Sequence, residues 1–360
     1  MTEAVLLVGG QGMRLRPLTV NTPKPMLPVA GVPVTAHQIA RAREAGVTRV
    51  ILGTSYRADV FRDHFGDGRS LGVELVYAVE DEPLGTGGAI RNVAALLQSG
   101  PDDPVLIFNG DILTGVDLGG LLDAWRAASA DVTLYLTRVG DPRAYGLVPT
   151  DDTGRVLAFL EKPQTPEEIV TDQINAGCYV FARRVIDRIP AGRPVSVERE
   201  TFPDLLTSGA VVTGVVDDGY WLDLGTPMAF VKGSADLVRG VAPSPALPGP
   251  VGERLLLAGA AVAADAMVAG GTCVGIGARV ESGAIVTGSV VFDGAVIGAE
   301  AVVCDSIIGA GAVVGAGCSL TGVVVGDGAI LGAGNEFTAG ARIWPNAVIG
   351  DTAVRFSPDR

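Results

Sequence analysis

Residues 4–19 read AVLLVGGQGMRLRPLT, a short apolar run that leads into three glycines and two arginines. The apolar run predicts a buried strand, and glycine N–H groups can approach an anion closely because no Cβ stands in the way. From residue 8 to residue 28 the chain carries three cations, Arg14, Arg16 and Lys24, and no Asp or Glu. The segment therefore predicts a strand followed by a loop that cradles phosphates.

Four prolines, at positions 17, 23, 25 and 28, stiffen the chain after this loop. Proline fixes φ and removes an N–H group, so Lys24 is presented from a restrained backbone. No Gly-Lys-Ser/Thr follows the glycines, which excludes a Walker A loop. The local positive charge stands out because the whole chain has a net charge of -13.

Composition narrows the class of protein. A chain of 360 residues predicts two domains, and its acidic balance argues against a nucleic-acid or membrane partner. There are two histidines, and the four cysteines lack the spacing of a metal site, which favours buried thiols in a reducing cytosol. The opening residues lack the pattern of a cleavable leader, so we expect a cytoplasmic protein.

Up to about residue 240, strand-like runs alternate with helical patterns, which favours a mostly parallel sheet covered by helices. Ligands of such sheets bind beyond the carboxyl ends of the strands, where both the glycine loop and Asn109-Gly110-Asp111 would lie. The expected strands cover residues 4–8, 49–53, 73–79, 105–108 and 132–137, and the expected helices cover residues 33–45, 88–97 and 118–128.

A proline-rich segment at 241–250 predicts a stiff linker between domains at 1–240 and 251–360. Beyond it, apolar residues recur every 17 positions, in two steps of six and one of five. This period predicts a β-helix, in which three short strands form each coil and apolar residues stack inward. The repeating sets are Val274, Val291, Ile308 and Val325; Val280, Ile297, Val314 and Leu331; Val286, Val303, Leu320 and Phe337; and Gly277, Gly294, Gly311 and Gly328.

Two aspartates follow strand-like runs, Asp111 in FNGD and Asp223 in YWLDLGTP. Two carboxylates together with phosphate oxygens make a plausible Mg²⁺ shell, because this ion keeps water ligands and uses few protein groups. Each aspartate alone could instead cap a turn at the end of a strand.

These segments resemble the signature of nucleoside-diphosphate-sugar pyrophosphorylases over essentially the full length, and within them most closely the actinobacterial mannose-1-phosphate guanylyltransferases. The resemblance implies a Rossmann-like nucleotidyltransferase sheet and a left-handed β-helix of hexapeptide repeats. It implies an enzyme that joins GTP to mannose 1-phosphate, with Mg²⁺, and releases GDP-mannose and pyrophosphate. The β-helix, which contains no histidine, is then expected to be a regulatory module or to assemble a homo-oligomer.

The resemblance also implies roles for single residues. Arg14 would hold the leaving β- and γ-phosphates, and Lys24 would stabilise charge at the α-phosphate. Met13 departs from the family, which usually has Thr or Ser there. The other implied residues are Gly9, Gly10, Gly12, Glu82, Gly85, Thr86 and Gly87 for the nucleotide, Gly146, Glu161, Lys162 and Asn175 for the sugar phosphate, and Asp111 and Asp223 for the metal.

The chemistry of such a reaction suits a site without histidine. A phosphate monoester has a second pKa of about 6, so the attacking group is largely ionised at neutral pH and needs no general base. Only three of the 27 basic residues are lysines, which suggests that Lys24 and Lys162 are needed as point charges. The alternatives are a related enzyme, making GDP-heptose, ADP-glucose or dTDP-glucose, and a regulatory subunit that binds nucleotide sugar without catalysis.

Overall fold

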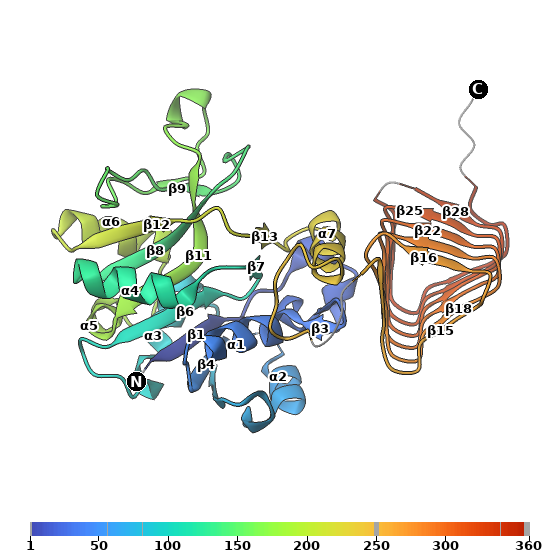
Figure 1. Cartoon of the computed structure of the whole chain (residues 1–360), viewed down its shortest axis with the longest axis horizontal. Helices are drawn as coiled ribbons and strands as arrows, with labels where there is room; N and C mark the ends of the chain where they lie inside the picture. The colour runs from blue at the N-terminus through green and yellow to red at the C-terminus, as the bar shows by residue number, and fades with distance from the viewer. Residues whose placement is uncertain (1, 56, 81, 248–251, 339, 356–360) are drawn as a thin grey trace. The chain divides into compact units, whose positions relative to one another are not determined.

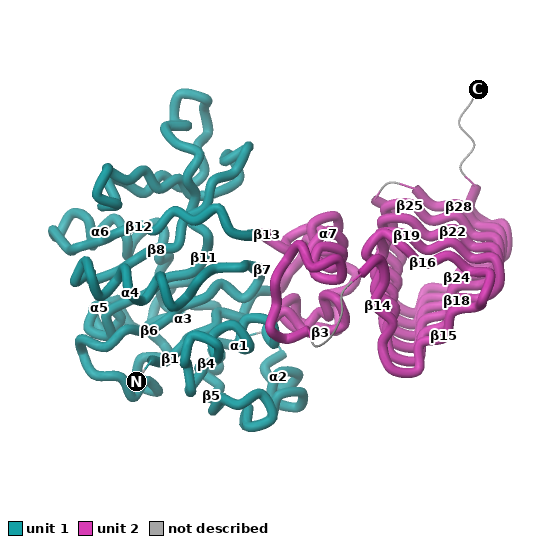
Figure 2. The backbone as a smooth tube through the Cα atoms, in the orientation of Figure 1, with its two compact units in different colours: residues 1–10, 35–221 teal, residues 11–34, 222–360 magenta. Residues whose placement is uncertain are grey.

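The computed structural model describes residues 2–55, 57–80, 82–247, 252–338 and 340–355. Contacts between Cα atoms divide the chain into two compact units, which Figure 2 shows in different colours. Unit 1 holds residues 1–10 and 35–221, and unit 2 holds residues 11–34 and 222–360. Residues 248–250 of the expected linker lie outside the described part of the chain.

Unit 1 is built on a nine-stranded sheet whose centre is parallel. The first strand, β1 (Glu3–Leu7), lies between β4 (Arg49–Thr54) and β6 (Pro104–Asn109), and β5 (Glu74–Val79) pairs with β4. All four strands are parallel and begin and end within one or two residues of the expected ranges. The apolar side chains of β4 and β6 are almost fully buried, as continuous apolar runs in a covered sheet predict, whereas Val79 at the end of β5 is exposed.

The other half of this sheet is mixed. The long strand β11 (Gln173–Ala182) runs antiparallel to both β6 and β8 (Val132–Arg138), and β12 (Val212–Val216) runs parallel to β8. The sequence analysis does not predict β11. The sheet is completed by the antiparallel pair β9 (Gly146–Leu147) and β10 (Leu160–Glu161), and β7 (Ile112–Thr114) follows β6.

The helices confirm two expected ranges and correct a third. The helices α1 (Val34–Glu44) and α4 (Leu118–Ala128) lie where the pattern predicts them. The third, α3 (Gly85–Asn92), begins and ends earlier than the expected 88–97, and a 3₁₀ turn at Ala94–Leu96 follows it. The remaining helices are α2 (Ala58–Phe65), α5 (Arg183–Arg188), α6 (Phe202–Thr207) and α7 (Pro227–Val238).

Tertiary contacts explain the early start of α3. Its first turn contains three glycines, which have low helix propensity. The N–H groups of Gly87 and Gly88 donate to the Val195 carbonyl oxygen at 2.8 and 3.2 Å, and the Val195 N–H donates to the Leu84 carbonyl oxygen at 2.8 Å. These hydrogen bonds with Val195 therefore hold the first turn of α3 in helical form, although its glycines have low helix propensity.

Unit 2 contains the expected β-helix (Figure 1), in which strands of successive coils pair in parallel. Its 17-residue register is direct, since Val290 pairs with Ile307 and Ile307 with Val324. The regular stacking is consistent with the left-handed β-helix that the resemblance implies.

The first coil sheet holds β14 (Arg254–Leu256), β17 (Thr272–Val274), β20 (Val290–Val291), β23 (Ile307–Ile308), β26 (Val324–Val325) and β29 (Arg342–Ile343). The second holds β15 (Ala261–Val262), β18 (Arg279–Val280), β21 (Val296–Ile297), β24 (Val313–Val314), β27 (Ile330–Leu331) and β30 (Val348–Ile349), and the third holds β16 (Met267–Ala269), β19 (Ile285–Thr287), β22 (Val302–Cys304), β25 (Ser319–Thr321) and β28 (Glu336–Phe337).

The interior of the β-helix is a stack of the repeating apolar residues. The four repeating glycines that begin at Gly277 have φ between 64 and 67°, a conformation that strains residues with a Cβ. Hydroxyl groups also link successive coils: the Thr272 hydroxyl accepts from the Ser289 N–H, and the Ser289 hydroxyl accepts from the Ser306 N–H. Each coil is therefore bonded to the next by side chains as well as by backbone.

The rest of unit 2 is the segment after β1 and the chain around α7. Three short 3₁₀ turns, η1 (Met13–Leu15), η2 (Leu18–Val20) and η3 (Lys24–Met26), lead into the hairpin of β2 (Pro28–Val29) and β3 (Val32–Pro33). The Ser234 hydroxyl on α7 accepts from the Ala30 N–H at 3.1 Å, which ties this hairpin to the helix. The short strand β13 (Trp221–Asp223) precedes α7.

Candidate active site

The loop after β1, residues 9–16, is called the signature loop below. At its start the Val8 N–H donates to the Gly53 carbonyl oxygen at 2.9 Å, and the Ser55 hydroxyl donates to the Gly9 carbonyl oxygen at 2.7 Å. A Cβ on residue 9 would lie 2.7 Å from the Ser55 Oγ, whereas a Cβ on Gly10 would meet nothing within 4 Å. Gly9 therefore allows a close backbone approach, and the loop at Gly10 stays open.

Within unit 2, Gly12 and Lys24 pack against each other. Gly12 has φ 60°, and a Cβ there would lie 2.8 Å from the Lys24 Cβ. The Thr19 hydroxyl donates to the Gly12 carbonyl oxygen at 2.9 Å. Lys24 lies in η3 beside two prolines and is buried, so the stiff backbone expected from the prolines fixes the start of this side chain.

Two cations of this segment meet one carboxylate. The Arg14 guanidinium lies 3.9 Å from an Asp223 oxygen, and the Lys24 ammonium lies 3.6 Å from the other. The Arg14 side chain is 67% exposed, whereas that of Lys24 is 9% exposed. A Cβ on Gly225 would lie 2.5 Å from the guanidinium, so the glycine after Asp223 makes room for Arg14. Unit 2 thus brings together three of the expected site residues.

Asp111 lies in unit 1, directly after β6. The Gly110 N–H donates to the Leu7 carbonyl oxygen at 3.0 Å, and a Cβ on residue 110 would lie 2.5 Å from that oxygen. Only glycine fits this close approach. The Gln38 side chain donates to the Asn109 and Ile112 carbonyl oxygens at 2.8 and 3.1 Å. The turn that carries Asp111 is therefore held from both sides, at the carboxyl end of the strand as expected.

Three of the residues expected to bind the sugar phosphate are neighbours in unit 1. Gly146 pairs with Glu161 across β9 and β10, and a Cβ on residue 146 would lie 2.9 Å from a Glu161 carboxylate oxygen. Lys162 lies 3.3 Å from the Glu161 carboxylate and has φ 51°. A non-glycine residue in the left-handed region points to a backbone that the surroundings dictate.

Asn175 lies on β11, next to this hairpin. Its side-chain amide donates to the Tyr179 hydroxyl at 2.8 Å, and its side-chain oxygen accepts from the Gly177 N–H at 3.0 Å. Burial raises the pKa of Tyr179 well above its usual range, so this hydroxyl is protonated at neutral pH. Asn175 is therefore held in a fixed rotamer, which suits a group that orients a ligand.

The segment 82–88 is called the base loop below, from the role that the resemblance implies. Glu82 is exposed before α3, Gly85 has φ 70°, and Gly87 is buried. The Thr86 hydroxyl donates to the Glu198 carboxylate at 2.8 Å and accepts from the Val197 N–H at 2.9 Å. The base loop is thus fixed by polar contacts with the segment at 195–198.

Comparison with known proteins identifies the family of this fold. A family model described as "Nucleotidyl transferase" matches residues 3–240. The chain belongs to the nucleotidyl transferase family. A mannose-1-phosphate guanylyltransferase of Mycobacterium tuberculosis is 59% identical over 358 residues, which are 99% of this chain and 98% of that protein. The similarity therefore includes the β-helix, and the expected family is confirmed.

Two further relatives match the nucleotidyl transferase part. The catalytic subunit beta of mannose-1-phosphate guanylyltransferase from Drosophila melanogaster is 37% identical over 233 residues, covering 64% of this chain and 62% of that protein. The crystal structure of HddC from Yersinia pseudotuberculosis complexed with GMP-PN has a TM-score of 0.56 and 27% identity, covering 66% of this chain and all of that one.

Nucleotidyltransferases of this family generally use a divalent metal, and the donor groups here fit one. The candidate ligands, Asp111 and Asp223, are both carboxylates, the oxygen donors that hard divalent ions prefer. Among the described residues no group of three His, Cys, Asp or Glu side chains could hold an ion alone. Asp111 in unit 1 and Asp223 in unit 2 are each a candidate ligand for such a metal.

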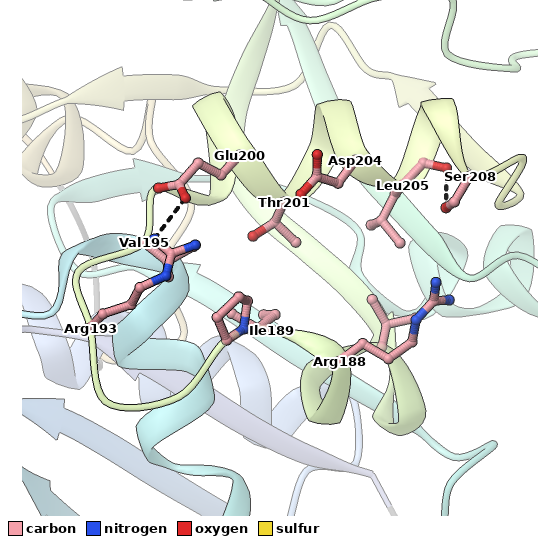
Figure 3. Close-up of a pocket in the computed structure, with 11 residues that line it drawn as sticks. Arg188, Ile189, Arg193, Val195, Glu200, Thr201, Asp204, Leu205 and Ser208 are labelled. Carbon is pink, nitrogen blue, oxygen red and sulfur yellow. Dashed lines mark hydrogen bonds and ion pairs between the residues drawn. The ribbon is translucent and has the colours of Figure 1, made fainter.

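A pocket of about 240 Å³ in unit 1 of this nucleotidyltransferase is lined by residues from 185–195 and 200–208 (Figure 3). Val195 and Thr201 belong to its lining, and Arg193 and Glu200 form an ion pair of 2.9 Å at its edge. No residue expected to bind substrate lines it.

In the part of the chain that the structure describes, no helix is both long and apolar enough to cross a bilayer.

Some residues that hold the site lie outside the motifs that the sequence shows. Ser55 fixes Gly9, and Glu198 fixes Thr86, but neither lies in a pattern that a single sequence exposes. Arg342 of the β-helix donates hydrogen bonds to backbone oxygens of the signature loop. Here a signal exists, because the equivalent positions of earlier coils are apolar.

Proposed function

We propose that this nucleotidyltransferase joins GTP to mannose 1-phosphate and releases GDP-mannose and pyrophosphate, with Mg²⁺. The observation that carries the proposal is the cluster of Arg14, Lys24 and Asp223 in a chain that is 59% identical, over nearly its full length, to a named mannose-1-phosphate guanylyltransferase. A protein that only binds nucleotide sugar would need cations for phosphate, but it would not also need the two carboxylates of Asp111 and Asp223.

The reaction is an in-line displacement. An oxygen of the ionised sugar phosphate forms a bond to the α-phosphorus of GTP, and the bond from that phosphorus to the bridging β-oxygen breaks. Pyrophosphate leaves with the electron pair, and no proton has to move in the bond-making step. The main barrier is repulsion between two anions, which positively charged groups and fixed positions offset.

The signature loop and the turn η3 supply these charges. Arg14, which is exposed, reaches the β- and γ-phosphates, and Lys24, which is buried on a stiff turn, neutralises charge at the α-phosphate. Gly9, Gly10 and Gly12 let backbone N–H groups approach the nucleotide. Both cations face Asp223, so the protein itself keeps them in place for phosphate.

Asp111 and Asp223 would hold Mg²⁺. When bound, this ion would supply positive charge that offsets the repulsion between the phosphate groups. The two aspartates contribute carboxylate oxygens, and Asp223 also balances the charges of Arg14 and Lys24.

The sugar phosphate would lie at the hairpin of β9 and β10. Lys162 binds its phosphate, Glu161 and Asn175 bind sugar hydroxyls, and the Gly146 N–H approaches the ring. At the nucleotide end, Glu82, Gly85, Thr86 and Gly87 contact the base. A guanine base agrees with the structure of HddC, which is complexed with GMP-PN.

The proposed organisation is a catalytic domain at 1–240, a linker at 241–250 and a β-helix at 251–360 that assembles a homo-oligomer. We place the enzyme in the cytoplasm, where both substrates are soluble, and we assign it no nucleic-acid or membrane partner because of its acidic charge.

A grid of nucleoside triphosphates against sugar 1-phosphates, with pyrophosphate release as the readout, tests this function. The expected result is the highest kcat/KM for GTP with mannose 1-phosphate. A higher value for another pair would replace the substrate assignment with a related one. No pyrophosphate from any pair, in a protein that still binds GDP-mannose, would identify a regulatory subunit instead.

A further inference from the structure

The four middle strands of the first coil sheet, β17, β20, β23 and β26, have buried residues on both faces. Side chains of neighbouring strand residues point to opposite faces, so the inward column of Val274, Val291, Ile308 and Val325 is expected to be buried. The outward column is Cys273, Val290, Ile307 and Val324, and each of these is at most 3% exposed. In the second coil sheet, by contrast, the outward residues Arg279 and Ile330 are exposed. The first sheet is therefore covered from outside.

In the same compact unit, α7 and the hairpin after the signature loop pack against the β-helix next to this sheet. The rings of Phe230 on α7 and Phe292 on the β-helix lie edge to face with centroids 6.3 Å apart. A Cβ on Gly271 would lie 2.7 Å from the Ala235 Cβ, and a Cβ on Gly31 would lie 2.4 Å from a Leu257 methyl group. Such close approaches join the β-helix firmly to the chain that carries Arg14 and Lys24.

Arg342 breaks the outward column at the last coil. It pairs with Val324 in the register of the sheet, so it stands where four earlier coils have buried Cys, Val or Ile. Its Nη1 donates to the Arg14 carbonyl oxygen at 2.7 Å and also to the Arg16 carbonyl oxygen. The one charged member of the column thus reaches past the apolar contact to the backbone of the signature loop.

We propose that Arg342 is a positioning residue, by which the β-helix sets the conformation of the signature loop and so the affinity for the nucleoside triphosphate. This proposal rests on the proposed function, in which Arg14 binds the leaving phosphates. The two carbonyl oxygens flank Leu15, which is buried; one belongs to Arg14 in the turn η1, and the other to Arg16, which caps the end of that turn. Holding them fixes the direction in which this exposed side chain leaves the backbone.

The charge of Arg342 matters as well as its shape. Two carbonyl dipoles point at one guanidinium, and hydrogen bonds to a charged donor are stronger than neutral ones. Without it, the turn can rotate, and Arg14 loses a defined starting position for its contact with phosphate. The binding of the sugar phosphate, which the resemblance places at Glu161 and Lys162, does not depend on this turn.

The test compares Arg342→Met with the wild-type chain, because methionine keeps a long stem and removes the donors. We expect the KM for GTP to rise roughly tenfold, the size that the loss of one or two charge-assisted hydrogen bonds allows. The KM for mannose 1-phosphate stays unchanged, and kcat changes much less. Arg342→Lys, which keeps a charged donor, restores part of the affinity.

Arg279→Met is the matched control. Arg279 is also an arginine on a β-helix strand, but it is exposed and pairs with the Glu281 carboxylate at 3.7 Å. Its kinetic constants and melting temperature should equal those of the wild type. Equal KM values for GTP in the wild type, Arg342→Met and Arg279→Met would overturn the proposal. An Arg279→Met variant with the same defect as Arg342→Met would also overturn it.

Hydrogen exchange separates this proposal from the substrate assignment. The Leu15 and Arg16 N–H groups donate to the Gly12 and Met13 carbonyl oxygens in the wild type. In Arg342→Met they should exchange faster, while those of β26 keep their rates. This readout needs no substrate, so it stays decisive if the grid assigns another nucleotide. Unchanged exchange of the signature loop would show that Arg342 does not hold it.

Discussion

The signature loop and the base loop are both glycine-rich, yet they are held in opposite ways. Beside the signature loop, Arg14 and Lys24 face a carboxylate at 3.9 and 3.6 Å. The base loop has no cation between residues 82 and 88, and the Val195 backbone and Glu198 fix it through hydrogen bonds. One loop is organised by charge and the other by shape.

This difference sets how each loop responds to change. A charge acts over several ångströms, and removing it leaves the opposite charge unbalanced in the site. A glycine acts only through the space that its missing Cβ leaves, so its replacement displaces neighbours by fractions of an ångström. We therefore expect substitutions that remove the charge of Lys24 or Asp223 to act on turnover, and those in the base loop to act on nucleotide affinity and choice.

The largest effect is expected for Asp223→Asn. Asparagine keeps the shape but removes the charge that faces two cations and that would hold Mg²⁺. We expect kcat to fall by about 10³-fold or more, as for loss of a group that stabilises transition-state charge. Pyrophosphate release measured across a Mg²⁺ titration gives this number.

Asp236→Asn is the control for that experiment, because Asp236 lies on α7 in the same unit and forms an ion pair with Lys232. It should keep wild-type turnover. If Asp223→Asn is as active as this control, the charge cluster is a structural ion pair and the comparison with the base loop fails.

Lys24→Met should have the next largest effect. Methionine retains the stem of this buried side chain, so the fold is kept while the charge at the α-phosphate is lost. A decrease in kcat of about 10²- to 10³-fold is expected, measured with saturating substrates. Lys232→Met, at the exposed lysine of α7, should leave kcat unchanged. A decrease of the same size in both lysine variants would mean that net charge, and not position, matters.

Gly85→Ala tests the shape side of the comparison. Residue 85 has φ 70°, and its Cβ would lie 2.7 Å from the Val195 carbonyl oxygen. We expect the KM for GTP to rise about tenfold, an affinity loss of about 1.4 kcal/mol, with a smaller change in kcat. Gly140→Ala, where a Cβ meets nothing within 4 Å, is the control. A loss of kcat without a change in KM would place Gly85 on the charge side.

The β-helix was the easiest part to predict from the sequence. Its repeat imposes the same requirement on every coil, so the apolar columns that begin at Val274, Val280 and Val286 are visible in one sequence. The central parallel strands were also found, because each is a continuous apolar run. The antiparallel β11 was not predicted, because Gln173, Asn175 and Gly177 interrupt the apolar run in its first half.

The site was predictable only in part. Arg14, Lys24 and Asp223 carry charges in unusual motifs, and the structure brings them together. Ser55 and Glu198 act through contacts with residues 46 and 112 positions away, and no local pattern encodes such pairs. Arg342 was partly predictable. The repeat shows that its position is apolar in earlier coils, but it does not show which residues Arg342 contacts.

The smallest effect is expected for Glu80→Gln, which tests whether a charge next to the base loop matters, since the Glu80 carboxylate accepts from the Leu84 N–H. Burial raises the pKa of Glu80, and the hydrogen bond from the Leu84 N–H lowers it by less. The folded state therefore disfavours the ionised form, and stability decreases as pH rises from the ordinary pKa near 4.5 through the raised value.

Glutamine can still accept from Leu84 but has no charge. At pH 7 the variant should be more stable by about 0.5 kcal/mol or less, since the side chain is only half-buried. At pH 4, where both states bind the proton, the difference in melting temperature should vanish. An equal difference at both values would show that shape alone acts at this residue.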